Sequence, residues 1–387
     1  MIIETNLGLA SFCEEISAAP ALFLDTEFVS EGRYYPEVGT IQIAAGEHAA
    51  LIDPLAVSDL APLATLLFDP KITKVFHAAN HDLSIFHRIF GRALAPVFDT
   101  QLAAALVGYE WQISFGQLVE RVTRVRLKKS HSFTDWLRRP LSAKQVEYAL
   151  EDVDFLAPIY ERLTTELRAR GRWEWAREEF SILEDPARFT PADPRELVMK
   201  VRGWERLNSP ELAALSRLVI WREATARETN LPVGQVCMDI VLLELARRPR
   251  KTVDQLNEIR GIRSQQIKRF GGALIELLAD CTGAVCDIEP AKATPLSAAL
   301  EPTVDFLNLC LKALAAENNL ASSILASRSD LSAIVLEGSE AHVPLMRGWR
   351  REVVGNTILE ALQGHATVRI VPGNRQVHLK WHQHPVE

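Results

Sequence analysis

Four acidic residues and one tyrosine, widely separated in the chain, have the chemistry of a divalent-metal site. Asp25 and Glu27 lie two residues apart in an apolar run of strand length, so strand alternation places both on one side of the backbone. Asp82 follows a second apolar run, and Tyr148 and Asp152 lie four residues apart. Two carboxylates on one strand face repel each other unless cations lie between them. The pattern therefore predicts that these residues meet at one metal site.

Each of these residues falls in a segment that can present it. The segment 74–86 is typical of a strand that runs into a helix, and Asp82 would lie in the first turns, where the helix dipole favours a carboxylate. The segment 142–153 opens with a serine cap and has helical composition, so Tyr148 and Asp152 share one face. We expect one strand and two helices to bring the acids and the phenol together.

The residue types indicate phosphodiester hydrolysis. That reaction needs a water made nucleophilic near neutral pH and a stabilised leaving oxyanion, and two divalent ions about 4 Å apart supply both. Three Asp and one Glu suit hard ions such as Mg²⁺ or Mn²⁺, whereas Cys and His would suit softer ones. The tyrosine adds a hydroxyl that can orient the attacking water.

Taken singly, these residues have simpler explanations. An acidic pair at a strand end is most often a solvated turn, an early helical acid complements the dipole, and a helical tyrosine most often belongs to the core. Their joint occurrence, in this order and with apolar flanks, favours the metal site. His77 and His81 have the spacing of helical zinc ligands, but Ala78 stands where a zinc protease has its Glu. His77 is instead expected beside Asp82 in the substrate groove, with a structural histidine as the alternative.

The pattern resembles the DEDD superfamily of 3′→5′ exonucleases, and within it the ribonuclease D family. The resemblance rests on ordered motifs: FLDTEF (23–28), YYPEVGTIQI (34–43), LIDP (51–54), FDT (98–100), TDWLRRPL (134–141) and YALEDV (148–153). In the histidine branch of the superfamily a His lies five residues before the last Asp. Here position 147 is Glu and position 148 is Tyr, so the tyrosine branch fits.

The resemblance implies a 3′→5′ exoribonuclease that releases nucleoside 5′-monophosphates, with transfer-RNA precursors among its substrates and two Mg²⁺ or Mn²⁺ ions as cofactors. It also implies individual roles. Asp25 would bridge the two ions, Glu27 and Asp152 would complete the first site, Asp82 would hold the second through water, and Tyr148 would orient the nucleophilic water. We expect the substrate to be bound by Thr26, Phe28, His77 and Asn80.

The order of elements predicts an α/β domain followed by all-α domains. Strand-like runs (21–28, 40–45, 49–52) alternate with helical ones (58–67, 100–107), and after 158 strand signals largely vanish. By resemblance, the first domain is ribonuclease H-like, with a mixed sheet flanked by helices, and two HRDC-type helical domains follow. The expected divisions are 1–165 (exonuclease), 166–199 (helical, proline-rich linker), 200–281 (HRDC), 295–364 (second, divergent HRDC-like domain) and 365–387 (C-terminal tail). Within the tail, 366–381 alternates like a short hairpin that turns at 372–374.

Composition and charge bound the environment of the protein. The 387 residues carry a net charge of −7, but the segment 200–280 has more Lys and Arg than Asp and Glu, which favours nucleic-acid contact. No stretch resembles a signal peptide or a membrane span. The five cysteines are scattered without zinc spacing, as in reducing compartments. We expect a cytoplasmic monomer without an obligate protein partner.

Two alternatives to an RNA-directed enzyme remain open. A DNA-directed exonuclease for repair or proofreading would use the same carboxylates, and only contacts to the 2′-hydroxyl would separate the two. A non-catalytic RNA-binding scaffold would have no use for four intact acids and the tyrosine.

Overall fold

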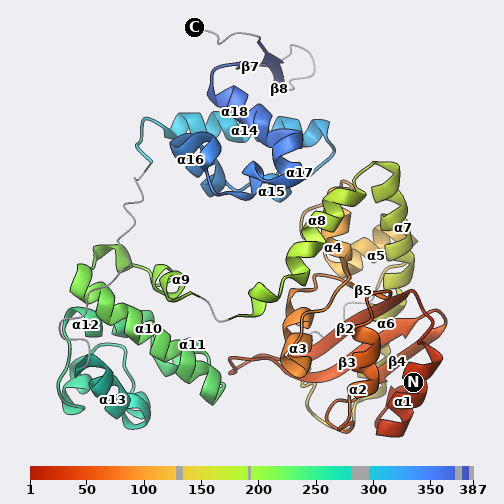
Figure 1. The fold of residues 1–387 in the computed structure, drawn as a ribbon, viewed down its shortest axis with the longest axis horizontal. Helices are drawn as coiled ribbons and strands as arrows, with labels where there is room; N and C mark the ends of the chain where they lie inside the picture. Colours follow the sequence, from red (N-terminus) through yellow and green to blue (C-terminus); the bar gives the residue numbers. More distant parts are fainter. Residues whose placement is uncertain (128–133, 191–192, 280–295, 371–376, 383–387) are drawn as a thin grey trace. The chain divides into compact units, whose positions relative to one another are not determined.

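The structure is a computed structural model that describes residues 1–127, 134–190, 193–279, 296–370 and 377–382. By its internal contacts the chain divides into two compact units, which Figure 1 draws with their elements labelled. The first unit comprises Met1–Glu27, Gly39–Arg188 and Pro295–Glu387. The second comprises Phe28–Val38 and Phe189–Thr294.

A mixed sheet of six strands lies at the centre of the first unit. Its strands, in spatial order β1-β4-β3-β2-β5-β6, are β1 (Ile2–Ile3), β4 (His48–Ile52), β3 (Glu37–Ala45), β2 (Ala21–Val29), β5 (Thr73–Phe76) and β6 (Val97–Asp99). β2 is parallel to β5, β5 to β6 and β1 to β4, whereas β3 is antiparallel to β4. The central strands are nearly continuous apolar runs because both faces of the sheet are covered. The expected mixed sheet is confirmed.

The register of the parallel strands determines where a site can form. Phe23 on β2 pairs with Val75 on β5, and Phe76 at the end of β5 pairs with Asp99 at the end of β6. β5 and β6 therefore end level with each other, beside the second half of β2. Ligand sites in such sheets lie at the carboxyl ends of the strands. This edge holds the predicted acids.

Helices surround the sheet. They are α1 (Asn6–Glu15), α2 (Ala61–Leu67), α3 (Asn80–Phe90), α4 (Thr100–Leu106), α5 (Phe115–Thr123), α6 (Ala143–Asp154), α7 (Leu156–Ala169) and α8 (Trp173–Glu184), followed by a 3-10 turn, η1 (Pro186–Phe189). α6 packs on β4, α7 on β5 and α8 on β6. The predicted start of α6 is confirmed, because Ser142 and Gln145 form a reciprocal capping box.

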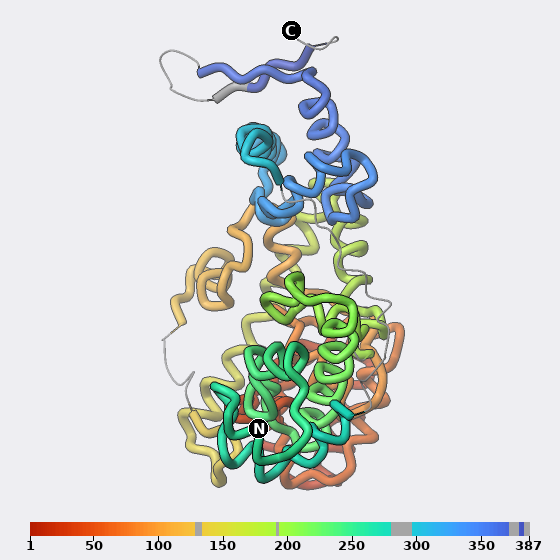
Figure 2. Tube along the Cα trace, turned by 90° about the vertical axis from the view of Figure 1, so that its left-hand side faces the viewer, coloured from red at the N-terminus to blue at the C-terminus, as the bar shows by residue number. Residues whose placement is uncertain are grey.

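The C-terminal part of the first unit is helical and ends in a strand pair. Its elements are α14 (Glu301–Glu317), α15 (Ser322–Leu325), α16 (Arg328–Glu337), η4 (Gly338–Glu340), η5 (Pro344–Met346), α17 (Gly348–Arg350), the π-helix η6 (Arg351–Gly355), α18 (Asn356–Leu362), β7 (Ala366–Ile370) and β8 (Val377–Trp381). The blue end of the trace in Figure 2 runs from α18 into the β7–β8 pair. The pair is antiparallel, which confirms the predicted hairpin, while its predicted turn at 372–374 lies outside the described residues.

One hydrophobic core joins this C-terminal part to the exonuclease helices. Phe98 of β6 and Phe180 of α8 belong to the same buried cluster as Leu307 of α14 and Trp349 of α17. α8 falls in the segment 166–199 that proline content had marked as a linker. Its buried residues Ala176, Phe180 and Leu183 follow helical spacing, so this part packs as a core helix.

The second unit is a small helical bundle with its own core. Its elements are α9 (Pro194–Met199), η2 (Trp204–Arg206), α10 (Ser209–Thr229), α11 (Val233–Val236), α12 (Asp239–Arg247), η3 (Asp254–Glu258) and α13 (Ser264–Ala279). α10 begins with a capping box from Asn208 to Glu211. The segment 28–38 joins this unit, because the backbone N–H groups of Tyr34 and Tyr35 donate to Asn230.

No helix in the described ranges is both long enough and apolar enough to cross a membrane.

A buried ion pair fixes α17 against α8. The carboxylate of Glu179 accepts from the indole Nε1–H of Trp349 at 2.7 Å and from Arg350 Nη2 at 3.0 Å. The side chains of Glu179 and Arg350 are 7% and 11% exposed, and Trp349 stacks on Trp175 with ring centroids 4.8 Å apart. A charge that is buried this deeply destabilises the fold when its counter-charge is removed.

We expect Glu179→Gln to lower the free energy of unfolding by about 3 kcal/mol, because it leaves the Arg350 guanidinium buried without its counter-charge. Urea and thermal unfolding of the full chain measure this loss. Glu161→Gln, at an exposed position of α7, is the matched control and should unfold like the wild type. Equal stability of the two variants would contradict the assignment.

Candidate active site

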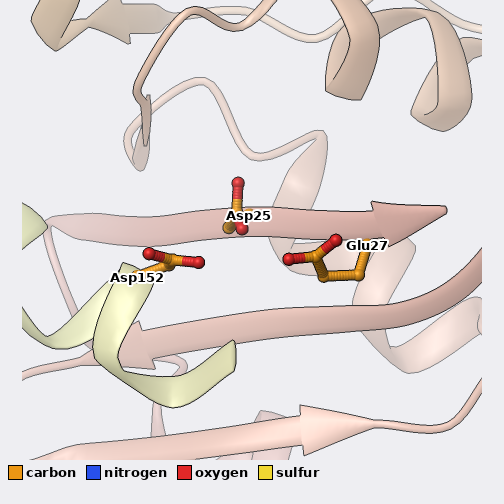
Figure 3. A group of neighbouring side chains, drawn as sticks. All are labelled: Asp25, Glu27 and Asp152. Carbon is orange, nitrogen blue, oxygen red and sulfur yellow. The ribbon is translucent and has the colours of Figure 1, made fainter. Parts of the chain in front are cut away.

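The second half of β2 presents the first two acids. Asp25 and Glu27 both reach one cluster with Asp152 of α6, and ligand atoms of the three carboxylates lie within 4.8 Å of one another. Figure 3 shows the carboxylates of Glu27 and Asp152 pointing toward each other, with Asp25 on the strand between them. Strand alternation on β2 and the approach of α6 thus bring together residues that are 125 positions apart or more in sequence.

The fourth acid, Asp82, lies in the first turn of α3 and is 6% exposed. Its Oδ1 accepts a hydrogen bond of 2.6 Å from the hydroxyl of Thr26, the residue between Asp25 and Glu27. Its charge also contributes to raising the pKa of Asp25. Asp82 is therefore a neighbour of the three-carboxylate cluster, held in place by the strand that carries two of its members.

A further acid, Asp99, fixes the turn from which α3 starts. Its carboxylate accepts from the backbone N–H groups of Ala78 and Ala79, at 3.2 and 2.9 Å, and from Gln101 and Leu102 at the start of α4. Ala78 has a φ of 58°, which these bonds help to hold. Asp99 had no predicted role, although an Asp directly before a helix is a recognisable cap.

Burial raises the pKa of every acid in the site, and for Asp25 and Glu27 the charges of the other site acids add to it. Burial, followed by the charges of Asp152 and Asp82, raises the pKa of Glu27 to about 8. Burial also raises the pKa of Asp82 and of Asp152 to about 7, and that of Asp25 well above its ordinary value. Near neutral pH the cluster therefore retains protons unless a cation replaces them. An all-oxygen donor set of this density fits divalent metal ions.

Tyr148 adds a phenol to this cluster. Burial and the neighbouring carboxylates raise its pKa, so the hydroxyl keeps its proton, and it hydrogen-bonds to Asp152 one turn further along α6. The predicted i,i+4 pairing of Tyr148 and Asp152 is thus present in the structure.

A cavity of about 250 Å³ opens on the carboxylates. Its lining consists of Asp25, Thr26, Glu27, His77, Phe115, Tyr148, Asp152 and Leu156. Phe115 and Leu156 were not predicted, and both are apolar residues at the first position of a helix. Nothing in the sequence distinguishes such residues from core residues.

His77 lines the cavity with its ring and not with a free nitrogen. Nδ1 lies 2.9 Å from the hydroxyl of Thr100, and Nε2 lies 3.1 Å from the carbonyl oxygen of Ile113. Burial lowers the pKa of His77. Because both nitrogens are engaged within the protein, its ring face and edge are what it offers a ligand.

Two predicted substrate residues are not among the residues that line the cavity. The side-chain oxygen of Asn80 accepts a 2.5 Å hydrogen bond from Arg188 Nη2. Phe28 follows Glu27 on β2 and belongs by its contacts to the second unit.

Known proteins are similar to this chain in sequence and in fold. A family model described as 3′-5′ exonuclease matches residues 1–168, and a model described as HRDC domain matches 211–278. Ribonuclease D of Acidiphilium cryptum is 36% identical over 94% of this chain and 93% of its own length. Ribonuclease D of Gluconacetobacter diazotrophicus is 37% identical, with the same two coverages. The chain belongs to the ribonuclease D family.

A solved structure supports this membership. The chain superposes on Escherichia coli RNase D, described as an exoribonuclease involved in structured RNA processing, with a TM-score of 0.84 and 33% identity, covering 94% of this chain and 98% of that one. The protein is thus a hydrolytic 3′→5′ exoribonuclease with a ribonuclease H-like exonuclease domain and an HRDC domain, and its family implies divalent metal ions. A single HRDC match was found, so the expectation of two such domains is not confirmed.

The raised pKa values give this ribonuclease D a defined pH dependence. Folded-state values of about 7 to 8 exceed the ordinary values of 3.8 and 4.5, so between pH 4 and 8 the folded protein holds protons that the unfolded chain has released. The free energy of unfolding of the metal-free protein should therefore fall as pH rises through this window. Thermal unfolding in EDTA measures it.

Mg²⁺ or Mn²⁺ should restore more stability at pH 8 than at pH 5.5, because the cation must compete with protons at the lower pH. Asp25→Asn, which removes one charge of the cluster, should show a shallower fall. A midpoint in EDTA that is constant or rising between pH 5 and 8 would contradict the electrostatic account of the site.

Proposed function

We propose that this exoribonuclease shortens RNAs with an unpaired 3′ end, one nucleoside 5′-monophosphate at a time, and that transfer-RNA precursors are among its substrates. The observation that carries the proposal is the three-carboxylate cluster at the wall of a small cavity. A volume of about 250 Å³ is at the lower end of ligand pockets, which favours a single terminal nucleotide over a base-paired end.

We propose that two ions, Mg²⁺ or Mn²⁺, are held by the four acids. Asp25 would contribute to both ion sites, Glu27 and Asp152 to the first, and Asp82 to the second through water. Bound ions would lower the pKa of the attacking water and stabilise the leaving oxygen. The protein's part is to keep four carboxylates in place against their own repulsion.

The remaining cavity residues have roles of their own. The Tyr148 hydroxyl, protonated and bonded to Asp152, orients the attacking water. The ring of His77 lies 5.3 Å from that of Phe115, and together with Leu156 they form an apolar wall against which the terminal nucleotide packs. Thr26 lines the cavity, and its hydroxyl also holds the carboxylate of Asp82 by a hydrogen bond. Phe28 and Asn80 stay proposed contacts to the RNA beyond its last nucleotide.

The domain organisation is part of the proposal. We propose an exonuclease domain at 1–165, a connecting segment at 166–199, an HRDC domain over 200–281, a second, divergent HRDC-like domain over 295–364 and a tail at 365–387. The second HRDC-like domain is supported by its helical content alone, and its helices share a core with α8. The buried free thiols of Cys13, Cys237 and Cys310 favour a reducing compartment such as the cytoplasm, and we propose that the protein acts there as a monomer.

The HRDC domain offers a cationic surface for the body of the RNA. Arg260, Arg263, Lys268 and Arg269 are exposed around the start of α13, and among the described residues none has an acidic partner. Arg263 and Arg269 also flank a cleft beside Phe270, over whose ring Arg269 lies at 5.2 Å. In contrast, Arg121, Arg162 and Arg170, which line a larger cavity in the first unit, are each paired with Glu110 or Glu166. Unpaired cations favour phosphate contact.

The double variant Arg263→Ala/Arg269→Ala should bind tailed RNA more weakly, and its affinity should depend less on salt. The slope of log affinity against log salt should fall by about one for each phosphate that the variant no longer binds. Arg162→Ala, which removes a paired arginine, is the control and should keep the wild-type slope. Binding titrations in EDTA at several KCl concentrations measure both. An unchanged slope in the double variant would remove this surface from the RNA path.

Asp25→Asn should abolish hydrolysis while the protein stays folded, with stability in EDTA equal to or above that of the wild type, because one repelling charge is lost. A 5′-labelled RNA with an unpaired 3′ tail, resolved on denaturing gels with Mg²⁺ or Mn²⁺, should shorten stepwise with the wild type only.

The same assay separates the alternatives. Faster shortening of the matching DNA would indicate a DNA-directed enzyme, and an RNA that is bound but never shortened would indicate a scaffold. Retained activity in a folded Asp25→Asn variant would overturn the metal site.

A further inference from the structure

Three sequence motifs that carry no catalytic residue meet around the guanidinium of Arg139, which precedes α6. Its hydrogen bonds run from Nε to Asp53 Oδ2 (2.5 Å), from Nη2 to Asp53 Oδ1 (2.8 Å) and Gly39 O (2.7 Å), and from Nη1 to Trp136 O (2.8 Å) and Arg138 O (3.0 Å). A guanidinium has five N–H groups, and all five are used here. Arg139 therefore has no donor left for RNA, and its function lies within the protein.

The partners of Arg139 are buried and closely packed. Asp53, just after β4, is 3% exposed and also accepts from the N–H of Leu55. Gly39, on β3, lies so close to the Trp136 segment that a Cβ there would come within 2.5 Å of the Trp136 carbonyl oxygen. The backbone of Trp136 is thus fixed in two ways. Arg139 links it to Asp53 at the end of β4, and the absence of a side chain at Gly39 lets it pack directly on β3.

What this cluster supports is the side chain of Trp136. The indole is 2% exposed, and its ring lies against that of Tyr148, with centroids 6.2 Å apart and planes inclined by 33°. Tyr148 lines the cavity at the carboxylates and bonds to Asp152. The indole consequently forms one wall of the space in which the tyrosine ring is held.

We infer that Trp136, held in place by Arg139, is a positioning residue that keeps the Tyr148 hydroxyl directed at the carboxylate cluster. The inference deepens the proposed function and rests on the role proposed there for Tyr148. Trp136 itself is not among the residues that line the cavity, so it acts through the tyrosine.

The competing explanation is that Trp136 is only a core residue. The way in which α6 is anchored distinguishes this explanation from a positioning role. The helix is held by its own capping box at Ser142 and Gln145, and Ala149 and Val153 are fully buried on its inner face. The capping box is formed by Ser142 and Gln145 alone. Loss of the indole should leave Asp152 in place and free the Tyr148 ring to turn.

Trp136→Ala should therefore lower kcat on tailed RNA by roughly 10- to 100-fold, the usual cost of a misplaced group, with KM unchanged. Trp136→Phe, which restores an aromatic wall, should recover most of the rate. Stabilisation by Mn²⁺ in thermal unfolding should equal that of the wild type in both variants, because the carboxylates are untouched. If Trp136→Ala does not fold, Trp136→Leu takes its place, because it retains more of the apolar side chain than Ala does while removing the ring.

A double-mutant cycle with Tyr148→Phe decides the matter. If Trp136 acts through the tyrosine hydroxyl, Trp136→Ala should cost nothing further in the Tyr148→Phe background. Fold-losses that multiply, or a Trp136→Ala enzyme with wild-type kcat, would overturn the inference while leaving the metal site standing. A Tyr148→Phe enzyme at full rate would instead overturn the proposed role of the tyrosine, and the inference with it.

Discussion

The repulsion among buried carboxylates is the constraint on which the rest of this structure depends. Asp25, Glu27 and Asp152 lie within 4.8 Å of one another, with Asp82 close by, and all four have raised pKa values. Like charges this close separate unless the surrounding structure holds them or protons and cations neutralise them. Without a cation the site therefore retains protons, and a divalent cation can take their place, as metal-dependent hydrolysis requires.

Three polar residues hold the acids and the tyrosine of the site in place. Asp99 accepts four backbone N–H groups and so fixes the start of α3, which carries Asp82. Thr26 joins Asp82 to β2. All the N–H donors of Arg139 bond to Asp53 and to backbone carbonyl oxygens. In this way Arg139 supports Trp136, whose ring lies against that of Tyr148. None of these three residues needs to touch the scissile bond to affect the rate.

The two helical parts of the chain differ in their relation to the exonuclease domain. The helices after residue 296 share one core with α4, α7 and α8, so they stabilise the exonuclease domain through that core. The HRDC unit has a separate core and carries unpaired cations around α13. In the proposed function, its attraction for phosphate would be independent of sequence, whereas a free 3′ end would be selected at the cavity.

The sequence alone predicted the four acids, the tyrosine and the capping of α6, because these depend on local signals: two residues apart on a strand, four apart on a helix, a serine before a helix. The mixed sheet was expected from the family resemblance, and the strand pairing confirms it. The sequence did not predict the role of Asp99, the engaged nitrogens of His77, the lining by Phe115 and Leu156, or the packing of α8 in what looked like a linker. Those were decided by contacts between residues 20 to more than 100 positions apart, such as Asp99 with Ala79, His77 with Ile113 and Glu179 with Trp349. Only the folded chain brings such partners together, so no local sequence pattern predicts these contacts.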